Sequence, residues 1–221
     1  MSKIQENLDK IRKYTYKTGT RIIAVTKYVG YDKVIEAYDA GIRDFGENKV
    51  QDAIKKISSL PEEIQKSTTW HLVGHLQTNK VKGAVEYFDI IHSVDSIKLA
   101  NVISNTAKSS GKTQKILIQV NVAEEVTKYG FTVEDIKEVF PKIAKLDSIN
   151  IVGLMTIAPN SEDREFLRKI FKELRLLRDF FERKYGCNLP ELSMGMSNDY
   201  EIAVEEGSTM IRIGHLLFKN N

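Results

Sequence analysis

The stretch Ile22-Ile23-Ala24-Val25-Thr26-Lys27 is a short apolar run that ends in a lysine, and the turn-forming segment Tyr28-Val29-Gly30 follows it directly. Such runs, rich in β-branched residues and bounded by glycine, are typical of a buried strand. An amine held at the carboxyl end of a strand can condense with a carbonyl group. A lysine at this place is more commonly a solvated strand end, so the rest of the chain must decide between the two interpretations.

Similar apolar runs recur along the chain and alternate with longer segments that have apolar residues at helical spacing, a pattern that predicts repeated βα units and a parallel sheet. We expect strands near residues 22–26, 42–46, 69–74, 89–94, 115–122, 150–157, 191–195 and 210–213. We expect helices near residues 3–17, 32–40, 48–58, 77–86, 96–109, 132–145, 162–185 and 198–206. Eight parallel strands are the number that closes a barrel of this kind.

The sequence therefore predicts an α/β protein with a single (β/α)8 TIM barrel over residues 1–221 and an extra N-terminal helix. Little of the chain remains after the eighth strand to form a helix, and we expect the N-terminal helix to cover that gap. A stripe of apolar residues on the 162–185 helix predicts core packing. Its members are Phe166, Ile170, Leu174, Leu177 and Phe181.

Three sequence signals predict helix starts. Asp95-Ser96 and Ser161-Glu162 offer capping side chains, and Asn198 followed by Glu201 resembles a capping box.

The composition limits the classes of function. The chain has 221 residues, 42% of them hydrophobic, which allows one sizeable core. Its 33 Lys and Arg and 30 Asp and Glu are interleaved and leave a formal charge of +3, so nucleic acid is not an implied partner. We find neither a signal-peptide core nor a membrane span, and the single cysteine, Cys187, agrees with a reducing compartment, so we expect a cytoplasmic protein.

Ligands of such barrels bind at the carboxyl ends of the strands. Residues with polar or glycine chemistry follow most of the expected strands: Lys27; Gly46-Glu47-Asn48; His71, Gly74 and His75; Asn121; Met155-Thr156; Ser193 to Ser197; and Arg212 to His215.

The last two of these segments have the chemistry of a phosphate site. Gly195 and Gly214 let the backbone approach a ligand closely, Ser197 and Asn198 come at the start of a helix, and Arg212 adds a cation. Either segment alone is an ordinary βα turn. Together, and opposite a strand-end lysine, they indicate a site for pyridoxal 5′-phosphate, which needs an amine and a phosphate cradle.

Motifs along the chain resemble one known family. They are Ala24-Val25-Thr26-Lys27, Phe45-Gly46-Glu47-Asn48, Trp70-His71-Leu72-Val73-Gly74, Leu76-Gln77-Thr78-Asn79-Lys80, His92-Ser93-Val94-Asp95, Gly153-Leu154-Met155-Thr156, Leu192-Ser193-Met194-Gly195-Met196-Ser197 and Gly207-Ser208-Thr209-Met210-Ile211-Arg212-Ile213-Gly214. In this order, from about residue 4 to residue 218, they resemble the pyridoxal phosphate homeostasis protein family. Members of that family are single-domain relatives of the alanine racemase N-terminal barrel.

The resemblance implies how the cofactor would be held. Lys27 would form the internal aldimine. The Ser197 hydroxyl and the backbone amides of Gly214 and His215 would hold the phosphate, and Arg212 would face the pyridine nitrogen.

The resemblance also implies that Asn48 lies near the ring substituents and that Ser193 and Met194 line the site. Two positions depart from the family pattern. Lys49 stands where many relatives have tyrosine, and His215 stands where a short side chain is commoner, which leaves a side-chain role for His215 open. Tyr31 has the spacing of a phosphate-binding tyrosine of alanine racemase, and we interpret that match as fortuitous.

The four histidines do not predict a metal site, because none has short ligand spacing with a carboxylate and His71 and His75 should diverge. We interpret them as structural or cofactor-adjacent groups. Glu47 could be a general base, but its position equally fits a carboxylate that pairs with a strand-end cation.

We therefore expect a non-catalytic carrier that holds pyridoxal phosphate as a lysine aldimine, buffers or delivers it, and affects amino-acid and keto-acid metabolism indirectly. The second base of a racemase comes from a domain that this chain lacks, and arginine disfavours protonation of the ring nitrogen. Expected partners are the cofactor and apo-enzymes that use it, and we expect a monomer. The alternatives are a minimal pyridoxal phosphate-dependent racemase or transaminase, a cofactor-free Schiff-base aldolase and, with least support, a nucleic-acid-binding module.

Overall fold

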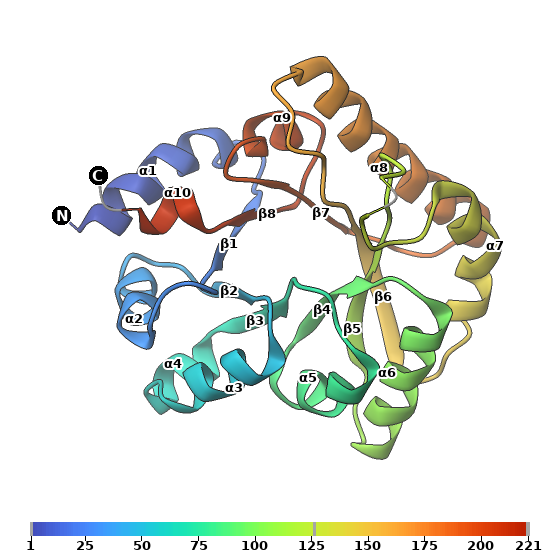
Figure 1. Ribbon diagram of the computed structural model, residues 1–221, viewed down its shortest axis with the longest axis horizontal. Coiled ribbons are helices and arrows are strands. Elements are labelled where there is room, and N and C mark those ends of the chain that lie inside the picture. Colours follow the sequence, from blue (N-terminus) through green and yellow to red (C-terminus); the bar gives the residue numbers. More distant parts are fainter. Residues whose placement is uncertain (1, 126, 220–221) are drawn as a thin grey trace.

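Eight parallel strands close into a barrel in the computed structural model, which describes residues 2–125 and 127–219 (Figure 1). The strands are β1 (Arg21–Val25), β2 (Asp44–Glu47), β3 (Thr69–Leu72), β4 (Ile90–Val94), β5 (Gln114–Gln119), β6 (Ile149–Met155), β7 (Glu191–Met196) and β8 (Met210–Ile213). They follow one another around the barrel in chain order, and β8 pairs with β1 to close it, with Ile23 in register with Arg212. The predicted fold class is confirmed.

Helices form a ring outside the strands (Figure 1). They are α1 (Lys3–Thr15), α2 (Tyr31–Asp39), α3 (Val50–Ser58), α4 (Glu62–Ser67), the short 3-10 helix η1 (Thr78–Lys80), α5 (Val81–Tyr87), α6 (Ile97–Ser109), α7 (Val133–Ile143), α8 (Arg164–Tyr185), α9 (Tyr200–Glu205) and α10 (His215–Phe218). Helix α4 was not predicted, and the segment expected as one helix at 77–86 divides into η1 and α5. The prediction of one domain over 1–221 extends to residues 1, 126 and 220–221, which lie outside the described parts.

Two apolar layers follow from the alternation of side chains along each strand. The larger layer lies between the strands and the helices and includes Ala24, Phe45 and Leu72. The smaller cluster fills part of the barrel interior and contains only five fully buried apolar residues: Ile23, Ile90, Leu117, Met155 and Met210. Much of the rest of the interior is therefore polar.

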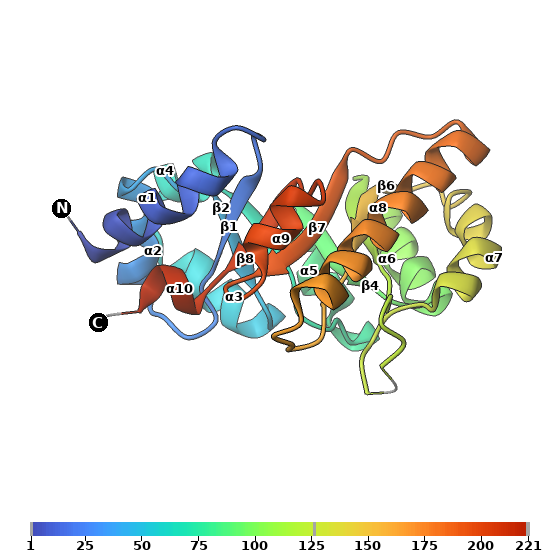
Figure 2. The ribbon, with the colours of Figure 1, turned by 90° about the horizontal axis from the view of Figure 1, so that it is seen from above.

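The N-terminal helix covers the closing strands, as predicted. Helices α1 and α10 lie side by side, with the two chain ends on the same side of the molecule (Figure 2). The buried Asn7 side chain on α1 donates to the carbonyl of Leu217 at 3.1 Å and to that of Lys219 at 3.4 Å. As expected, little helix follows the eighth strand: residues 215–218 form the single turn of α10.

The predicted helix details hold in part. Ser96 caps α6 as expected and accepts the amide of Leu99. Asp163, and not Ser161, caps α8, and Asp199 precedes α9, so the predicted capping box at Asn198 is wrong.

The expected apolar stripe of α8 is buried at Ile170, Leu174, Leu177 and Phe181, but Phe166 is 40% exposed. Phe166 lies in the first turn of α8, and the buried residues of the stripe lie further along the helix.

Within residues 2–125 and 127–219, no helix combines the length and the apolar character needed to cross a bilayer.

Candidate functional site

A cavity of about 1270 Å³ lies at the carboxyl ends of the strands. Six of the eight residues expected to bind cofactor line it: Lys27, Asn48, Ser197, Arg212, Gly214 and His215. Ser193 and Met194 are not among its lining residues. Parallel strands end at the same edge, so segments that are far apart in the sequence meet there.

Lys27 lies in a turn two residues beyond the end of β1, with its side chain exposed at the cavity. Its Nζ is 4.9 Å from the centroid of the Tyr28 ring, a cation-π distance. The residue before it is fixed: the Thr26 amide donates to the Gly46 carbonyl at 2.9 Å, and the Thr26 hydroxyl donates to Glu47 at 2.6 Å. An exposed amine therefore extends from an anchored backbone.

Glu47 contributes to that anchor. Its carboxylate is 1% exposed and forms an ion pair with Lys56, and the same ammonium donates to the Thr26 carbonyl at 2.6 Å. The expected pairing with a cation is correct in kind, but the cation comes from helix α3 and not from a strand end. Thr26 and Lys56 both contact the same oxygen, Oε1, of Glu47, and Glu47 is not among the residues that line the cavity.

The loops after β7 and β8 are joined at the opposite side of the cavity. The Leu216 amide donates to the Ser197 hydroxyl oxygen at 3.3 Å. The amide of His215 is the first of helix α10, and amides at that position have no acceptor within their own helix. A hydroxyl and outward-facing amides on one wall can hold a phosphate.

Gly195 makes the β7 turn possible. Its φ angle is +93°, and a Cβ there would lie 2.6 Å from the Cβ of Ala203. Both the backbone conformation and the close approach of α9 require glycine.

Arg212 projects from β8 into the barrel and is only 5% exposed. One terminal nitrogen donates to the Ser193 hydroxyl oxygen at 2.7 Å and the other to the Thr156 carbonyl at 2.9 Å. Both acceptors are uncharged. Among the described residues, no carboxylate is hydrogen bonded to this guanidinium. Burial lowers the pKa of Arg212 to about 10, and the nearby Asp199 carboxylate opposes that shift.

Ser193 and Met194 lie on opposite faces of β7. Ser193 is completely buried and faces the barrel interior, where its hydroxyl oxygen accepts from Arg212. Met194 is completely buried in the outer layer, between the strands and the helices. The expectation that the Met194 side chain lines the site is wrong, because neighbouring residues of a strand point to opposite faces.

Several cavity residues were missed in the sequence, including Leu167, Phe218, Lys219 and three further groups. The loop after β6 contributes residues 157–161, the loop after β5 contributes Glu125 and Lys128, and Asp199 follows Ser197. The rule that located the other residues, a polar or turn-forming segment directly after a strand, also applies to Ala158-Pro159-Asn160. Lys128 gave no such signal, because it stands nine residues beyond the end of β5 at Gln119.

Asp199 fixes a turn of the site and has a shifted pKa, and its sequence position reveals neither. One carboxylate oxygen accepts the Met196 amide at 2.5 Å and so fixes the turn that carries Ser197. Burial raises the pKa of this carboxyl, while that amide and the positive charges of Arg212 and Lys128 oppose the shift.

The two residues that depart from the family pattern, Lys49 and His215, lie at the rim of the barrel, as does Tyr31. Lys49 is exposed and precedes α3 without capping it through its side chain. Tyr31 is 54% exposed and is not among the cavity residues, which agrees with a fortuitous match.

The histidines separate into two groups. His71 and His92 lie inside the barrel and are completely buried, whereas His75 and His215 are exposed at the rim. His75 contacts Asp95 at 3.1 Å and stacks on Tyr129 with 3.8 Å between the ring centroids. The predicted divergence of His71 and His75 is confirmed.

Comparison with known proteins gives the family. The family model of the alanine racemase N-terminal domain matches residues 1–221. A pyridoxal phosphate homeostasis protein of Aquifex aeolicus (strain VF5) is 41% identical over 216 residues, which are 96% of this chain and 93% of that protein. The chain belongs to the pyridoxal phosphate homeostasis protein family. The resemblance inferred from its motifs is confirmed.

Solved structures agree with this family. PipY of Synechococcus elongatus PCC7942, solved with pyridoxal phosphate bound, is 38% identical with a TM-score of 0.88 and covers 98% of this chain and 100% of its own. An alanine racemase of Clostridium difficile 630 has a TM-score of 0.78 at 16% identity and shows the fold alone. This chain matches 56% of that racemase chain and 99% of itself.

Proposed function

We propose that this chain binds pyridoxal 5′-phosphate covalently through Lys27 and acts in the homeostasis of that cofactor by buffering or delivering it. The observation that carries the proposal is that one cavity brings together an exposed amine, a wall of phosphate donors and a buried arginine to which no carboxylate of the described residues is hydrogen bonded. The family membership and the relative solved with the cofactor support the same proposal.

The residues present fit the three polar parts of the cofactor. Lys27 matches the aldehyde, because an amine condenses with a carbonyl. The Ser197 hydroxyl and the amides of Gly214 and His215 match the phosphate. The guanidinium of Arg212, which carries N–H groups only and no acceptor, matches the lone pair of the ring nitrogen.

Bound pyridoxal phosphate supplies an electron sink for carbanion chemistry, and this chain's residues favour holding the cofactor over using that sink. Arg212 is a cation, so it keeps a proton off the ring nitrogen next to it. Lys27 offers a base on one face of the cavity only, and racemisation needs one on each face. We therefore propose a carrier and not a racemase or transaminase.

The same reasoning extends to partners. The cavity is wide and lies at the rim, where a recipient apo-enzyme can reach it, and we propose that such enzymes receive the cofactor from a monomeric carrier. Transfer from the loaded protein to an apo-enzyme should then be faster than spontaneous release into buffer. A transfer rate capped by the release rate would leave buffering as the function and exclude direct delivery.

The central test is Lys27→Ala, with Lys49→Ala as the matched control at an exposed rim lysine outside the cavity. The wild-type protein and the control, incubated with pyridoxal phosphate, should show a visible absorbance band that borohydride removes. Peptide mapping should place the reduced cofactor on Lys27, and Lys27→Ala should lack the band. An unchanged band in Lys27→Ala would refute the assignment of this lysine.

The enzymatic alternatives give different outcomes in two further assays. Chiral analysis of single amino acids after incubation with the loaded protein should show no turnover above that of free cofactor. Borohydride trapping of a sugar phosphate by the cofactor-free protein would instead favour a Schiff-base aldolase.

A further inference from the structure

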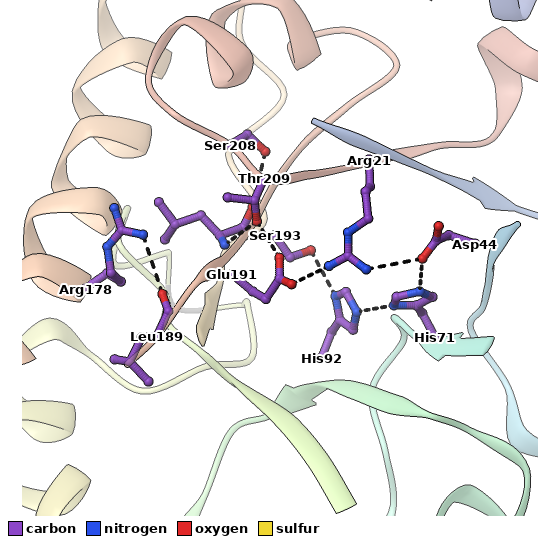
Figure 3. Close-up of polar contacts among 11 residues, drawn as sticks. Arg21, Asp44, His71, His92, Arg178, Leu189, Glu191, Ser193, Ser208 and Thr209 are labelled. Atoms are coloured by element: carbon purple, nitrogen blue, oxygen red, sulfur yellow. Dashed lines mark hydrogen bonds and ion pairs between the residues drawn. The ribbon is translucent and has the colours of Figure 1, made fainter. Parts of the chain in front are cut away.

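A line of hydrogen-bonded polar side chains runs through the inside of the barrel, from its amino-terminal end towards the cavity (Figure 3). At the amino-terminal end, Asp44 Oδ1 lies 3.0 Å from His71 Nε2. His71 Nδ1 then lies 2.9 Å from His92 Nε2. Three consecutive strands, β2, β3 and β4, contribute one member each.

The line continues across the barrel to the cavity. His92 Nδ1 lies 2.9 Å from the Ser193 hydroxyl oxygen, and this oxygen accepts from Arg212 at 2.7 Å. His71, His92 and Ser193 are each 0% exposed. The five side chains therefore connect a carboxylate at one end of the barrel to the guanidinium at the other.

The chemistry of the two ends fixes the direction of every hydrogen bond. An ionised Asp44 only accepts, so His71 Nε2 carries the proton and His71 Nδ1 of a neutral ring accepts from His92 Nε2. A neutral His92 then accepts at Nδ1 from the Ser193 hydroxyl. The hydroxyl oxygen is left to accept from Arg212, which only donates. With both rings neutral, one arrangement satisfies all four bonds.

The charges around the line favour that arrangement. Arg21 on β1 lies 3.5 Å from Asp44 and 2.5 Å from Glu191 on β7, so one guanidinium faces both carboxylates at this end of the line. Glu191 also accepts from the Thr209 hydroxyl at 2.7 Å. Burial first, and then the proximity of His71 and the positive charges of Arg212 and Arg21, lower the pKa of His92 well below its ordinary value, which keeps that ring neutral.

The line of hydrogen bonds meets two opposing electrostatic requirements at the ring nitrogen of the cofactor. A buried guanidinium needs an anion, but a carboxylate beside the ring nitrogen would favour protonation of that nitrogen. Asp199 acts on Arg212 through its charge and is not hydrogen bonded to it. Neutral groups with aligned hydrogen bonds let the more distant Asp44 polarise the guanidinium as well, and such chains of hydrogen bonds strengthen one another.

We propose that His71, His92 and Ser193 are positioning residues that hold Arg212 as a charged, fixed donor to the ring nitrogen of the bound cofactor. The proposal rests on the proposed function for its ligand. Two terminal nitrogens of Arg212 are tied to Ser193 and Thr156, so the orientation of the guanidinium is fixed before any ligand arrives. The line of hydrogen bonds from Asp44 then sets the strength of the hydrogen bond that Arg212 donates to the ring nitrogen.

The first test needs no cofactor. Nitrogen-15 NMR of the imidazole rings at pH 7.5 should show His71 and His92 neutral, each with its proton on Nε2. Ser193→Ala should shift the His92 Nδ1 signal by removing its donor. A proton on Nδ1 of either ring, or a doubly protonated ring, would overturn the arrangement.

The second test measures the ring-nitrogen bond through binding. The ratio of affinities for pyridoxal phosphate and its 1-deaza analogue, which lacks the ring nitrogen, reports that bond alone. His92→Phe and Ser193→Ala should each reduce the ratio by about tenfold, the size of one hydrogen bond of about 1.4 kcal/mol. His75→Phe is the matched control at a rim histidine, where phenylalanine can still stack on Tyr129, and it should keep the wild-type ratio.

The outcomes separate the two proposals. A wild-type protein that does not bind pyridoxal phosphate would refute the proposed function, while the ring signals would still report the line of hydrogen bonds. Equal ratios in the wild type, His92→Phe and Ser193→Ala would refute the positioning role. Ser193→Ala keeps the test decisive if His92→Phe does not fold, because it removes a single oxygen.

Discussion

The buried imidazole of His92 gives the barrel a dependence on pH. Its ring is completely buried, and its pKa lies well below the ordinary value of 6.5 because burial and nearby cations disfavour the charged form. In the unfolded chain the same ring binds a proton below about pH 6.5. Between its folded and unfolded pKa values the unfolded state therefore holds one more proton, so acid favours unfolding.

The free energy of unfolding should fall as the pH drops from 7.5 to 5, by up to about 1.4 kcal/mol per pH unit from this ring. Stability from neutral His92 is complete above about pH 6.5 and is lost as the pH falls towards its folded pKa. Urea denaturation across that range measures the slope. His92→Phe should flatten the slope relative to His75→Phe, and equal slopes in the two variants would contradict a neutral buried His92.

Individual strands and helices show which structural features the local sequence predicts and which it does not. The apolar runs predicted all eight strands, because a strand buried on both faces needs nearly continuous apolar residues. The ends of helices were less accurate: Ser161 and Asp163 both have capping chemistry, and only the path of the loop decides that Asp163 accepts the amides of Glu165 and Phe166. Helix α4 gave no apolar period, since Ile64 is its only buried residue.

At the scale of neighbouring strands, Gly74 controls the wall of the cavity. A Cβ at Gly74 would lie 2.4 Å from the carbonyl oxygen of Asn48 and 2.7 Å from its Cα, and these backbone atoms cannot turn aside. Gly74→Ala should push the Asn48 loop away, cost about 1–3 kcal/mol of stability and weaken binding of pyridoxal phosphate. Urea denaturation and fluorescence titration measure the two effects.

Gly111→Ala is the control for Gly74→Ala. Gly111 has a φ angle of +66° and nothing within 4 Å of its Cβ position, so alanine there costs only backbone strain of about 1 kcal/mol. It should leave cofactor affinity unchanged. Equal affinity in the two variants would mean that the Asn48 loop does not shape the site.

For the molecule as a whole, the barrel explains both the success and the limits of the predicted site. Strand ends gather at one edge, so Lys27, Ser197 and Arg212 could be grouped from sequence. Neighbouring residues of a strand point to opposite faces, so Ser193 and Met194 cannot both turn their side chains to the interior, and Met194 lies in the outer layer. The contacts of the interior line join five different strands, and no spacing within the sequence predicts them.

Helix α1 meets the segment 217–219 beside the site, and this contact should affect binding. Asn7 on α1 donates to the carbonyls of Leu217 and Lys219, which anchors the turn that contains His215. Asn7→Ala leaves buried carbonyl groups without a donor, at a cost of about 1–3 kcal/mol. Hydrogen exchange at the amides of residues 216–218 should become faster, and affinity for pyridoxal phosphate should fall because the phosphate amides lose their fixed position.

Gln5→Ala is the matched control for Asn7→Ala, because Gln5 lies on the same helix and, within the part of the chain that the structure describes, its side chain bonds only to Asp9 at the exposed surface. It should change neither exchange nor affinity. If Asn7→Ala speeds exchange at residues 216–218 but leaves the affinity at the wild-type value, the phosphate is not held by the backbone after β8. Ser197 would then have to supply the phosphate contact without the amides of Gly214 and His215, and Ser197→Ala should abolish binding instead of weakening it.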